Sequence, residues 1–287
     1  MKNFKTAWLM SCKYSFFIFF IMHNKVIIFR IVNLRFGRCE SLEDMWIAGK
    51  FDTKQIKCSN FARKEVEKLS LKGKATREAS FFATDAYVYV TFLNARSLRK
   101  HHEDISNDEE LMKSNVMGIA ETHLYDGETV ELEGFEANLV NDGKGKGVAA
   151  FSKMSPINVT KIKKENFSAI FLTFGDYRIV YIYVSKGANI EEIKTEIVPL
   201  LQDKSKPTIV MGDMNYDYQE AKHPLKYLFS EIDYIQMVEK VTHDEGNLLD
   251  HIYISSPNVL SKEDIYLKPL YFSDHDALCI RIVTKDK

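Results

Sequence analysis

One short stretch of the sequence, residues 209–215 (Ile-Val-Met-Gly-Asp-Met-Asn), most constrains what this chain can fold into. Its β-branched apolar residues follow Pro207 and predict a short buried strand. Gly212 lets the backbone turn where that strand ends. Asp213 and Asn215 lie two residues apart and therefore share one side of the strand end. A carboxylate and a carboxamide there suit water activation and contact with phosphate oxygens, although an ordinary Asx turn would use the same residues.

Polar side chains also border four other apolar runs. They are Asn94 after residues 87–93, Glu121 after residues 116–120, Asp250-His251 within residues 248–254, and Asp274-His275-Asp276 before residues 277–280. In α/β sheets, ligands gather where strand ends converge. One carboxylate at a strand end is commonplace, but five polar strand ends, two of which contain Asp-His, predict a shared site.

The residue types at these strand ends suit phosphate chemistry with a metal ion. Glu121 and Asp274 offer oxygen ligands of the kind that Mg²⁺ prefers, with Mn²⁺ as the alternative ion. No set of Cys and His has the spacing of a zinc site. A histidine beside an acid gains a raised pKa and a fixed tautomer, so it can hold a phosphoryl oxygen while Asp213 orients a water. These residues predict metal-assisted phosphodiester cleavage, provided that they meet in the folded chain.

Charge divides the chain into a basic first part and an acidic remainder. Residues 1–84 hold 16 Lys and Arg against 7 Asp and Glu, whereas residues 85–287 hold 23 against 33. This contrast indicates two pieces of different role. The hydrophobic content of 45% and the charged content of 28% are those of a globular protein. The four cysteines have no C-x-x-C spacing, which favours a reducing compartment over a disulfide scaffold.

From residue 85 onward, the apolar pattern alternates between strands and helices. Strands are expected over residues 86–93, 116–120, 147–152, 169–174, 178–184, 208–212, 248–254 and 277–283, and helices over residues 107–115, 190–201 and 224–230. The first of these helices is expected because Asn107 or Asp108 can start it, with acids in the first turn.

Four histidines outside the strand ends have two interpretations each. His101 and His102 are expected in a loop, as a solvated polar turn or as a contact to phosphate. His123 follows Glu121 by two residues, and a place in the same cleft is as consistent with the pattern as a plain loop. His243 precedes the Asp250 strand, where a loop position and a DNA contact both remain open.

In their order along the chain, these motifs resemble those of the endonuclease/exonuclease/phosphatase superfamily over about residues 86–284. The segments that carry the resemblance are Leu93-Asn94-Ala95-Arg96-Ser97-Leu98, Ile119-Ala120-Glu121-Thr122-His123-Leu124, Gly147-Val148-Ala149-Ala150-Phe151-Ser152, Tyr181-Ile182-Tyr183-Val184-Ser185, Gly212-Asp213-Met214-Asn215, Leu249-Asp250-His251-Ile252-Tyr253 and Ser273-Asp274-His275-Asp276. The first segment has the Asn-x-Arg-Ser-Leu form of the retroelement branch. The resemblance implies an α/β four-layer sandwich, in which two packed mixed β-sheets are flanked by helices.

The resemblance also implies roles for the matching residues. The implied catalytic residues are Asp213, Asn215, His275, Asp250 and Tyr183, the implied substrate-binding residues are Asn94, Arg96, Asn215 and Tyr183, and the implied metal ligands are Glu121, Asp274 and Asn94. Asp213 would activate the water, and Asp250 would orient His275. Arg96 departs from the apurinic-nuclease pattern, which has a second acid at that position, so a secondary metal contact is missing.

The first 84 residues divide into an apolar leader, residues 1–37, and a charged segment, residues 38–84. The run over residues 14–22 resembles the core of a signal peptide, but it is too short to span a bilayer and no small-residue cleavage site follows it, so secretion is not expected. Residues 38–84 resemble the C-terminal end of Helitron-type helicases, with a charged helix expected over residues 62–71; a basic linker is the alternative. The chain has no G-x-x-x-x-G-K-[ST] phosphate loop, so no ATPase activity is expected.

The leading interpretation is a Mg²⁺-dependent phosphodiester hydrolase, a DNA endonuclease domain of a mobile element in residues 85–287. Its expected partners are DNA and a missing helicase region, with no membrane partner, and its expected location is the nucleus. A phosphatase or lipid phosphodiesterase on the same fold is one alternative, and the acidic body favours it because phosphate binding normally wants Lys and Arg. A catalytically decayed transposon fragment is the other.

Overall fold

The computed structural model describes residues 7–12, 15–22, 25–31, 81–82, 87–143, 145–220, 224–257 and 261–283 of the 287-residue chain. The chain divides into two compact units, Met1–Phe81 and Phe82–Lys287. Each unit is described by itself. Among the described residues, none of the helices has the length and apolar content needed to cross a membrane.

The first unit contains a three-stranded antiparallel sheet with the order β1-β2-β3. Its strands are β1 (Ala7–Cys12), β2 (Ser15–Met22) and β3 (Lys25–Ile31). The apolar run expected to form part of a leader lies on the central strand β2. The segment that resembles a helicase end, including the helix expected over residues 62–71, falls almost wholly outside the described residues, so that resemblance and the three-part division of the chain stay predictions.

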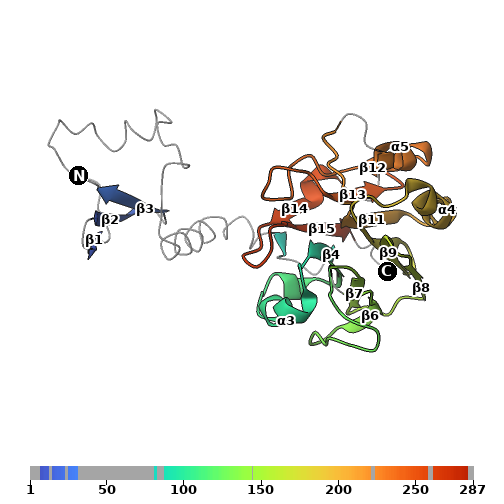
Figure 1. The fold of residues 1–287 in the computed structure, drawn as a ribbon, viewed down its shortest axis with the longest axis horizontal. Helices are drawn as coiled ribbons and strands as arrows, with labels where there is room; N and C mark the ends of the chain where they lie inside the picture. Colours follow the sequence, from blue (N-terminus) through green and yellow to red (C-terminus); the bar gives the residue numbers. More distant parts are fainter. Residues whose placement is uncertain are drawn as a thin grey trace. The chain divides into compact units, whose positions relative to one another are not determined.

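The second unit contains two six-stranded sheets (Figure 1). The first sheet has the order β14 (Ile265–Lys268), β15 (Ala277–Val283), β4 (Tyr87–Asn94), β5 (Val116–Ala120), β7 (Val148–Ser152) and β6 (Glu136–Val140). The second has the order β12 (Ile235–Gln236), β13 (Asp250–Ile254), β11 (Thr208–Asp213), β10 (Arg178–Val184), β9 (Phe167–Thr173) and β8 (Asn158–Lys163). Each sheet is mixed, because it holds one parallel pair among antiparallel neighbours.

The two parallel pairs are built in the same way. In the first sheet β4 pairs with β5, and helix α3 (Leu98–Ser106) lies between them in sequence. In the second sheet β10 pairs with β11, and helix α4 (Ile190–Leu201) lies between them. All four strands are buried along almost their whole length, which explains their continuous apolar sequences. Each βαβ unit therefore brings two strand ends to one edge of its sheet.

The main core lies between the two sheets. Tyr181 on β10 is fully buried there and stacks against Phe92 of β4, with ring centroids 6.2 Å apart. Gly118 on β5 makes room for the Tyr181 ring, since a Cβ atom at this glycine would lie 2.1 Å from Tyr181 Cδ1. The two sheets thus pack face to face, and at this position the Tyr181 ring fits only because the residue opposite it, Gly118, has no side chain.

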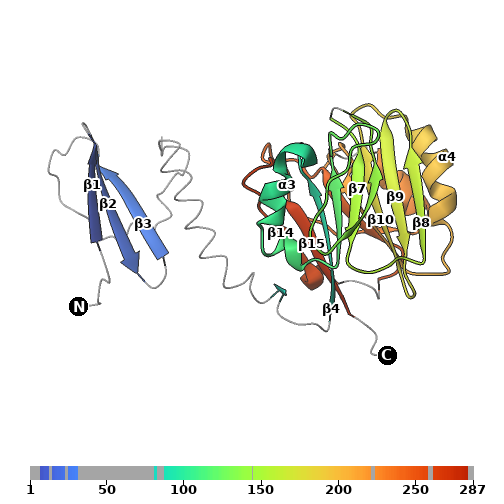
Figure 2. The same cartoon turned by 90° about the horizontal axis from the view of Figure 1, so that it is seen from below.

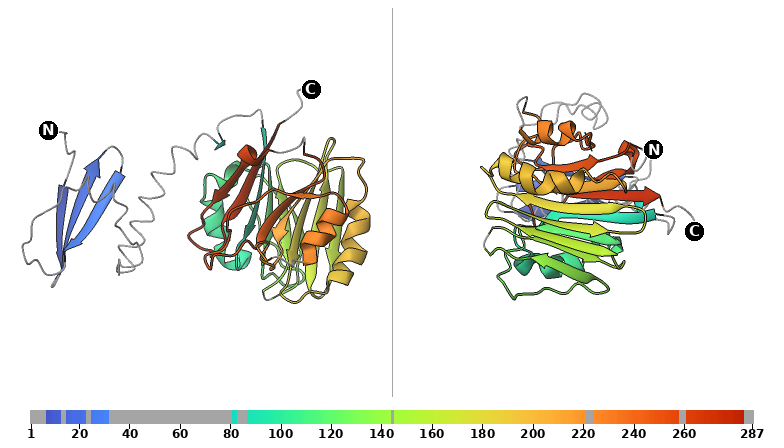
Figure 3. Two further views of the ribbon diagram at one scale, coloured as in Figure 1. Left: turned by 90° about the horizontal axis from the view of Figure 1, so that it is seen from above. Right: turned by 90° about the vertical axis from the view of Figure 1, so that its right-hand side faces the viewer.

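Helices cover the outer faces of both sheets (Figure 2). Helix α4 and helix α5 (Pro224–Glu231) lie side by side against the second sheet (Figure 3) and bury a stripe of apolar residues on it. Helix α3 lies on the opposite side of the unit, beside the first sheet, with Leu98 and Ile105 fully buried. Together these layers confirm the expected α/β sandwich of two packed mixed sheets flanked by helices.

The prediction of a helix over residues 107–115 is wrong. The α-helix is α3, which ends at Ser106, and only a short 3₁₀ turn, Leu111–Lys113, follows it. Ser97 starts α3 by accepting a hydrogen bond from the backbone N–H of Lys100 at 3.2 Å. Because α3 is strongly polar and buries only two side chains, its apolar periodicity is weak in the sequence.

The strand expected over residues 248–254 begins later, at Asp250, as β13. The backbone N–H groups of Leu248 and Leu249 donate instead to Asp217 Oδ1 and Thr242 Oγ1. The edge strands β6, β8, β12 and β14 were not expected from the sequence. They are exposed on one side or very short, so they lack the apolar run that identified the central strands.

Candidate active site

The sheet topology brings the polar strand ends together. Asn94 ends β4, Glu121 follows β5, Tyr183 lies next to the last residue of β10, Asp213 ends β11, Asp250 begins β13 and His275 precedes β15. The strands β13 and β15 run antiparallel to β11 and β4, so their beginnings lie where the parallel pairs end. Asp213 and Asp250 are direct partners in the register of β11 and β13. The residues predicted to share a site therefore lie at one edge of the sandwich.

Asp213 is a fully buried carboxylate held by amide donors. Its Oδ2 accepts hydrogen bonds from Asn94 Nδ2 at 2.9 Å and Asn215 Nδ2 at 3.3 Å, and its Oδ1 accepts from the Asn215 backbone N–H at 2.8 Å. Burial and the neighbouring Asp250 carboxylate raise the pKa of Asp213 to about 7, although His275 and the amide donors oppose the rise. Asp213 can therefore take up a proton near neutral pH.

Asp250 and His275 form a buried pair. The Nδ1 atom of His275 lies 2.8 Å from Asp250 Oδ2, and the backbone N–H of Asp250 donates to Thr242 Oγ1 at 3.0 Å. Burial lowers the pKa of His275, but the charge and hydrogen bond of Asp250, together with Asp213 and Asp274, raise it to about 9. The imidazole is thus charged at neutral pH and presents its Nε2–H away from Asp250.

Asn94 connects the two sheets at the site. It is fully buried, and its Nδ2 donates both to Asp213 and to Glu121 Oε1, the latter at 3.1 Å. Its Oδ1 accepts from the backbone N–H of Arg96 at 2.9 Å. All of its polar side-chain atoms are therefore bonded to protein, so in this arrangement Asn94 aligns two carboxylates; its predicted contact with metal or substrate stays a prediction.

Several backbone conformations at the site are strained. Arg96, Glu121 and Asn215 each have φ of 49°, in the left-handed region that side chains other than glycine rarely adopt. The carbonyl of Glu121 accepts a hydrogen bond from the Leu98 backbone N–H at 3.4 Å, and this contact ties Glu121 to the start of α3. Such strain is retained where the surrounding structure enforces it, and it is common at functional sites.

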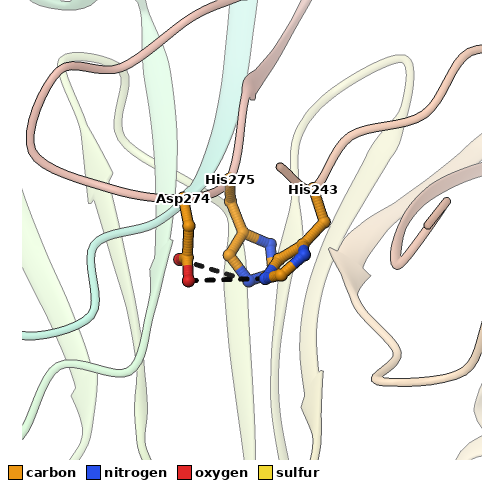
Figure 4. A group of neighbouring side chains, drawn as sticks. All are labelled: His243, Asp274 and His275. Atoms are coloured by element: carbon orange, nitrogen blue, oxygen red, sulfur yellow. Dashed lines mark ion pairs between the residues drawn. The ribbon is translucent and has the colours of Figure 1, made fainter. Parts of the chain in front are cut away.

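Asp274 lies at the rim with three basic neighbours. Its Oδ2 is 2.6 Å from Arg96 Nη1 and 3.4 Å from His243 Nε2, while its Oδ1 is 3.9 Å from His275 Nε2. Figure 4 shows the two imidazoles beside this carboxylate, and their ring centroids are 4.7 Å apart at 80°. A backbone β-bridge joins His243 to His275 and fixes this geometry.

A cleft of about 540 Å³ opens over these groups. It is lined by Arg96, Glu121, Tyr183, Lys186, Asn215, Asp217, Glu220, His243, Glu245, Asn247, Leu249, Asp274 and His275. Six of the predicted site residues are in this lining, whereas Asn94, Asp213 and Asp250 are buried and do not belong to it. The Tyr183 hydroxyl donates to the Gly145 carbonyl at 2.9 Å, and burial raises the pKa of Tyr183.

The oxygen atoms at the rim fit a divalent cation. Glu121 and Asp274 both line the cleft, and within the part of the chain that the structure describes Asp274 Oδ1 is buried and accepts no hydrogen bond. Among the residues that the structure describes, two sets of side chains have ligand atoms within 4.8 Å of one another: His243, Asp274 and His275, and Asp213, Asp250 and His275. Carboxylates of this kind suit a hard cation such as Mg²⁺, although Arg96 competes for the other oxygen of Asp274.

Some site residues were not found from the sequence. Lys186 lines the cleft two residues after β10, a position at which the strand-end pattern could have indicated it; Tyr183 on the same strand came from the family resemblance. Asp217, Glu220, Glu245 and Asn247 come from loops without a sequence signal. His101 and His102 lie on α3 and not in the expected loop. His123 Nε2 is 3.7 Å from Glu121 Oε2, but His123 is not part of the cleft lining.

The sequence profile of the Endonuclease/Exonuclease/phosphatase family matches residues 93–275. This match covers well over half of the chain and includes every residue of the site described above. The chain therefore belongs to this family of nucleases and phosphatases. A search of curated proteins finds no match.

Solved structures share the fold. An AP endonuclease from Archaeoglobus fulgidus is 15% identical with a TM-score of 0.57, covering 68% of this chain and 99% of its own. The Neisseria 3' phosphatase NExo, solved with a product DNA hairpin, is 14% identical with a TM-score of 0.55, covering 68% and 99%. The endonuclease domain of TRAS1, a telomere-specific non-LTR retrotransposon, is 13% identical with a TM-score of 0.54, covering 69% and 100%. At these identities the likeness shows the fold alone.

Proposed function

We propose that this protein is a divalent-metal-dependent phosphodiester hydrolase that cuts DNA internally. One observation carries the proposal: the buried Asp213 and the buried Asp250–His275 pair lie beneath a single cleft whose rim holds Glu121 and Asp274. A proton acceptor, a charged hydrogen-bond donor and oxygen ligands at one site are the groups that in-line phosphodiester hydrolysis needs.

Each group has a role that follows from its geometry. Asp213, with a pKa near 7, accepts a proton from the attacking water. The new bond forms between the water oxygen and phosphorus, and the bond from phosphorus to the departing sugar oxygen breaks. His275, which Asp250 keeps charged and oriented, donates its Nε2–H to a phosphoryl oxygen as negative charge grows there. Glu121 and Asp274 would hold Mg²⁺, or Mn²⁺ in its place, which neutralises phosphate charge when bound.

The remaining residues of the cleft position the phosphate. Asn215, with its backbone held by Asp213, and Tyr183, with its hydroxyl held by Gly145, both border the cleft. Arg96 reaches the same rim with a side chain that is 57% exposed and free to turn from Asp274 toward a phosphate. These three residues bind substrate in the proposal, while Asn94 holds Glu121 and Asp213 in place.

The proposal also specifies DNA as the substrate and a mobile element as the origin of the protein. An AP endonuclease, a 3' phosphatase solved with DNA and a retrotransposon endonuclease share this fold, which supports a nucleic-acid substrate. The Asn94-Ala95-Arg96-Ser97-Leu98 segment and the likeness of residues 38–84 to a helicase end support an origin in a mobile element. A nuclear location and a helicase region as partner follow from that origin.

A phosphatase or lipid phosphodiesterase is the second candidate. The observation that favours it is the excess of acids in residues 85–287, together with Asp217, Glu220 and Glu245 along the cleft. Such acids repel a long polyanion more than a small phosphate ester. A catalytically decayed fragment is the third candidate, and the complete hydrogen-bond network around Asp213 argues against it.

A plasmid-nicking assay of the full chain tests the proposal. We expect nicking in Mg²⁺ or Mn²⁺ and none in a chelator, with losses of at least about 10³-fold in Asp213→Ala and His275→Ala. Asp176→Ala is the matched control, because Asp176 is exposed and lies outside the cleft lining. Turnover of a sugar or lipid phosphate without DNA cleavage would favour the second candidate, and metal-dependent turnover of neither would favour the decayed fragment.

A further inference from the structure

An exposed aromatic side chain lies close in sequence to the cleft residue Asp274 and has no part in the chemistry above. Tyr271 is 72% exposed and lies three residues before Asp274, in the loop between β14 and β15. Phe272 follows it and is partly exposed. A single exposed aromatic needs no explanation by itself. What distinguishes Tyr271 is how it is held and what surrounds it.

The loop aromatics are fixed against helix α3. The Tyr271 hydroxyl donates to Asp104 Oδ1 at 2.5 Å, and the Phe272 ring stacks on the His101 ring, with centroids 5.2 Å apart and planes at 20°. The Tyr271 and Phe272 rings meet edge to face at 5.3 Å and 89°. His101 is in turn bonded to Asp104 at 2.8 Å. We call His101, Tyr271 and Phe272 the aromatic platform; its rings are already ordered, so binding against them costs little side-chain entropy.

Basic side chains lie on the residues from the cleft lining into helix α3. Arg96 just ahead of α3 lines the cleft and pairs with Asp274, which lies two residues after Phe272 in the same loop. Arg99, with a side chain that is 57% exposed, and Lys100, also exposed, extend along the first turn of α3. Part of this charge is compensated, since Arg99 pairs with Glu128 at 3.2 Å. The first turn of helix α3 thus carries basic side chains, and the residues that hold the platform, His101 and Asp104, follow on the same helix.

This combination suits an unpaired nucleic-acid strand better than a duplex. A duplex is held mainly through many phosphate contacts, and residues 85–287 carry more acids than bases. An unpaired base can stack on an aromatic ring whatever its sequence, and such stacking supplies affinity that does not depend on net charge. A few basic residues then suffice to guide the backbone.

We propose that the aromatic platform, with Arg96 and Lys100, binds an unpaired nucleic-acid strand next to the phosphodiester in the cleft, with a base stacked on Tyr271. This inference rests on the proposed function, because it assigns the substrate form that the same cleft receives. It makes the protein a nuclease of single-stranded or splayed DNA.

Binding of a fluorescein-labelled single-stranded oligonucleotide to the full chain tests the platform without relying on turnover. Fluorescence anisotropy in a chelator at physiological salt gives the dissociation constant, and the basic residues of the first unit are present in every variant. We expect Tyr271→Ala to bind about tenfold more weakly and Tyr271→Phe, which keeps the ring, to bind within about twofold of the wild type. Tyr227→Ala is the matched control, since Tyr227 is 56% exposed and outside the cleft lining.

Unchanged binding by Tyr271→Ala would overturn the platform, as would a duplex of the same sequence that binds the wild type as tightly as the single strand. Turnover separates this result from the proposed function. If the wild type hydrolyses bis-p-nitrophenyl phosphate, Tyr271→Ala should hydrolyse it normally while its KM for the oligonucleotide rises about tenfold. If the wild type hydrolyses neither substrate, the proposed function fails, and the anisotropy series still decides the platform.

Discussion

The side chains at the base of the cleft, which we call the floor, differ from those at its rim in burial and in the contacts that hold them. The floor consists of Asp213, Asp250 and His275, which are almost fully buried and whose ligand atoms lie within 4.8 Å of one another; a 2.8 Å hydrogen bond joins His275 to Asp250. The rim includes Arg96, Glu121 and Asp274, whose side chains are at least partly exposed. Their side-chain contacts are ion pairs and one hydrogen bond from the Asn94 amide. The floor is thus organised before substrate arrives, whereas the rim can exchange its protein contacts for a cation or a phosphate.

The buried carboxylates of the floor also affect the free energy of folding. Two carboxylates face each other in the register of β11 and β13, and each is removed from water. Burial and mutual repulsion favour the neutral form of Asp213, and a charged His275 only partly offsets this. A floor that is poised for proton transfer therefore costs folding free energy, which the large core between the sheets supplies.

The largest expected effect comes from the floor. Asp250→Asn removes the charge that keeps His275 protonated, so we expect kcat to fall about 10³-fold at pH 8, with a smaller loss at pH 6 where imidazole protonates unaided. The requirement for Mg²⁺ should not change, because Asp250 lies outside the cleft lining. A pH series of plasmid nicking at several Mg²⁺ concentrations measures both. A loss that is equal at all pH values would contradict this role for Asp250.

An intermediate effect is expected at the rim. Glu121→Gln removes an anionic oxygen but keeps the shape, so the Mg²⁺ concentration for half-maximal activity should rise about 10- to 100-fold. Glu133→Gln, an exposed glutamate outside the cleft, serves as control. The distinction between floor and rim predicts that extra Mg²⁺ rescues Glu121→Gln but not Asp250→Asn. If extra Mg²⁺ rescued both variants, or neither of them, the proposed difference in role between floor and rim would be contradicted.

The smallest effect is on the stability of the metal-free protein. The pKa of Asp213 is raised from its ordinary value to about 7 and that of His275 to about 9, so the folded protein binds more protons than the unfolded chain between pH 4 and 9. Both contributions are present at low pH and are lost as pH rises, the first through about 7 and the second through about 9.

We therefore expect these two groups to lower the free energy of unfolding by about 1–3 kcal/mol across this range. Urea unfolding in a chelator at pH 5, 7 and 9 measures the decline. It should be shallower in Asp250→Asn, because Asp250 raises both pKa values. A steeper decline in the variant would contradict the proposed coupling.

The central strands and the peripheral elements were not equally predictable from the sequence. The central strands β4, β5, β10 and β11 are continuous apolar runs, and the polar residues at the ends of β4, β5 and β11 indicated the site. Helix α3 was missed because its sequence, Leu-Arg-Lys-His-His-Glu-Asp-Ile-Ser, has only two buried positions. The same weakness concealed the platform: nothing about Tyr271 and Phe272 in sequence indicates that they rest on Asp104 and His101, some 167 to 171 positions away.

The sequence by itself determined which residue types stand at the strand ends, and so the kind of chemistry that we propose, because carboxylates, amides and a histidine there are local facts of residue type and hydrophobic pattern. Tertiary structure alone decided which of them face substrate. Asn94 and Asp213 were both expected at the cleft, yet both are fully buried at its base, because the ends of β4 and β11 lie opposite each other in the two packed sheets and Asn94 donates to Asp213 across them. Burial is a property of how sheets pack, and it separated residues of the same polar type into a buried floor and a more exposed rim, to which we assign proton transfer and ligand binding.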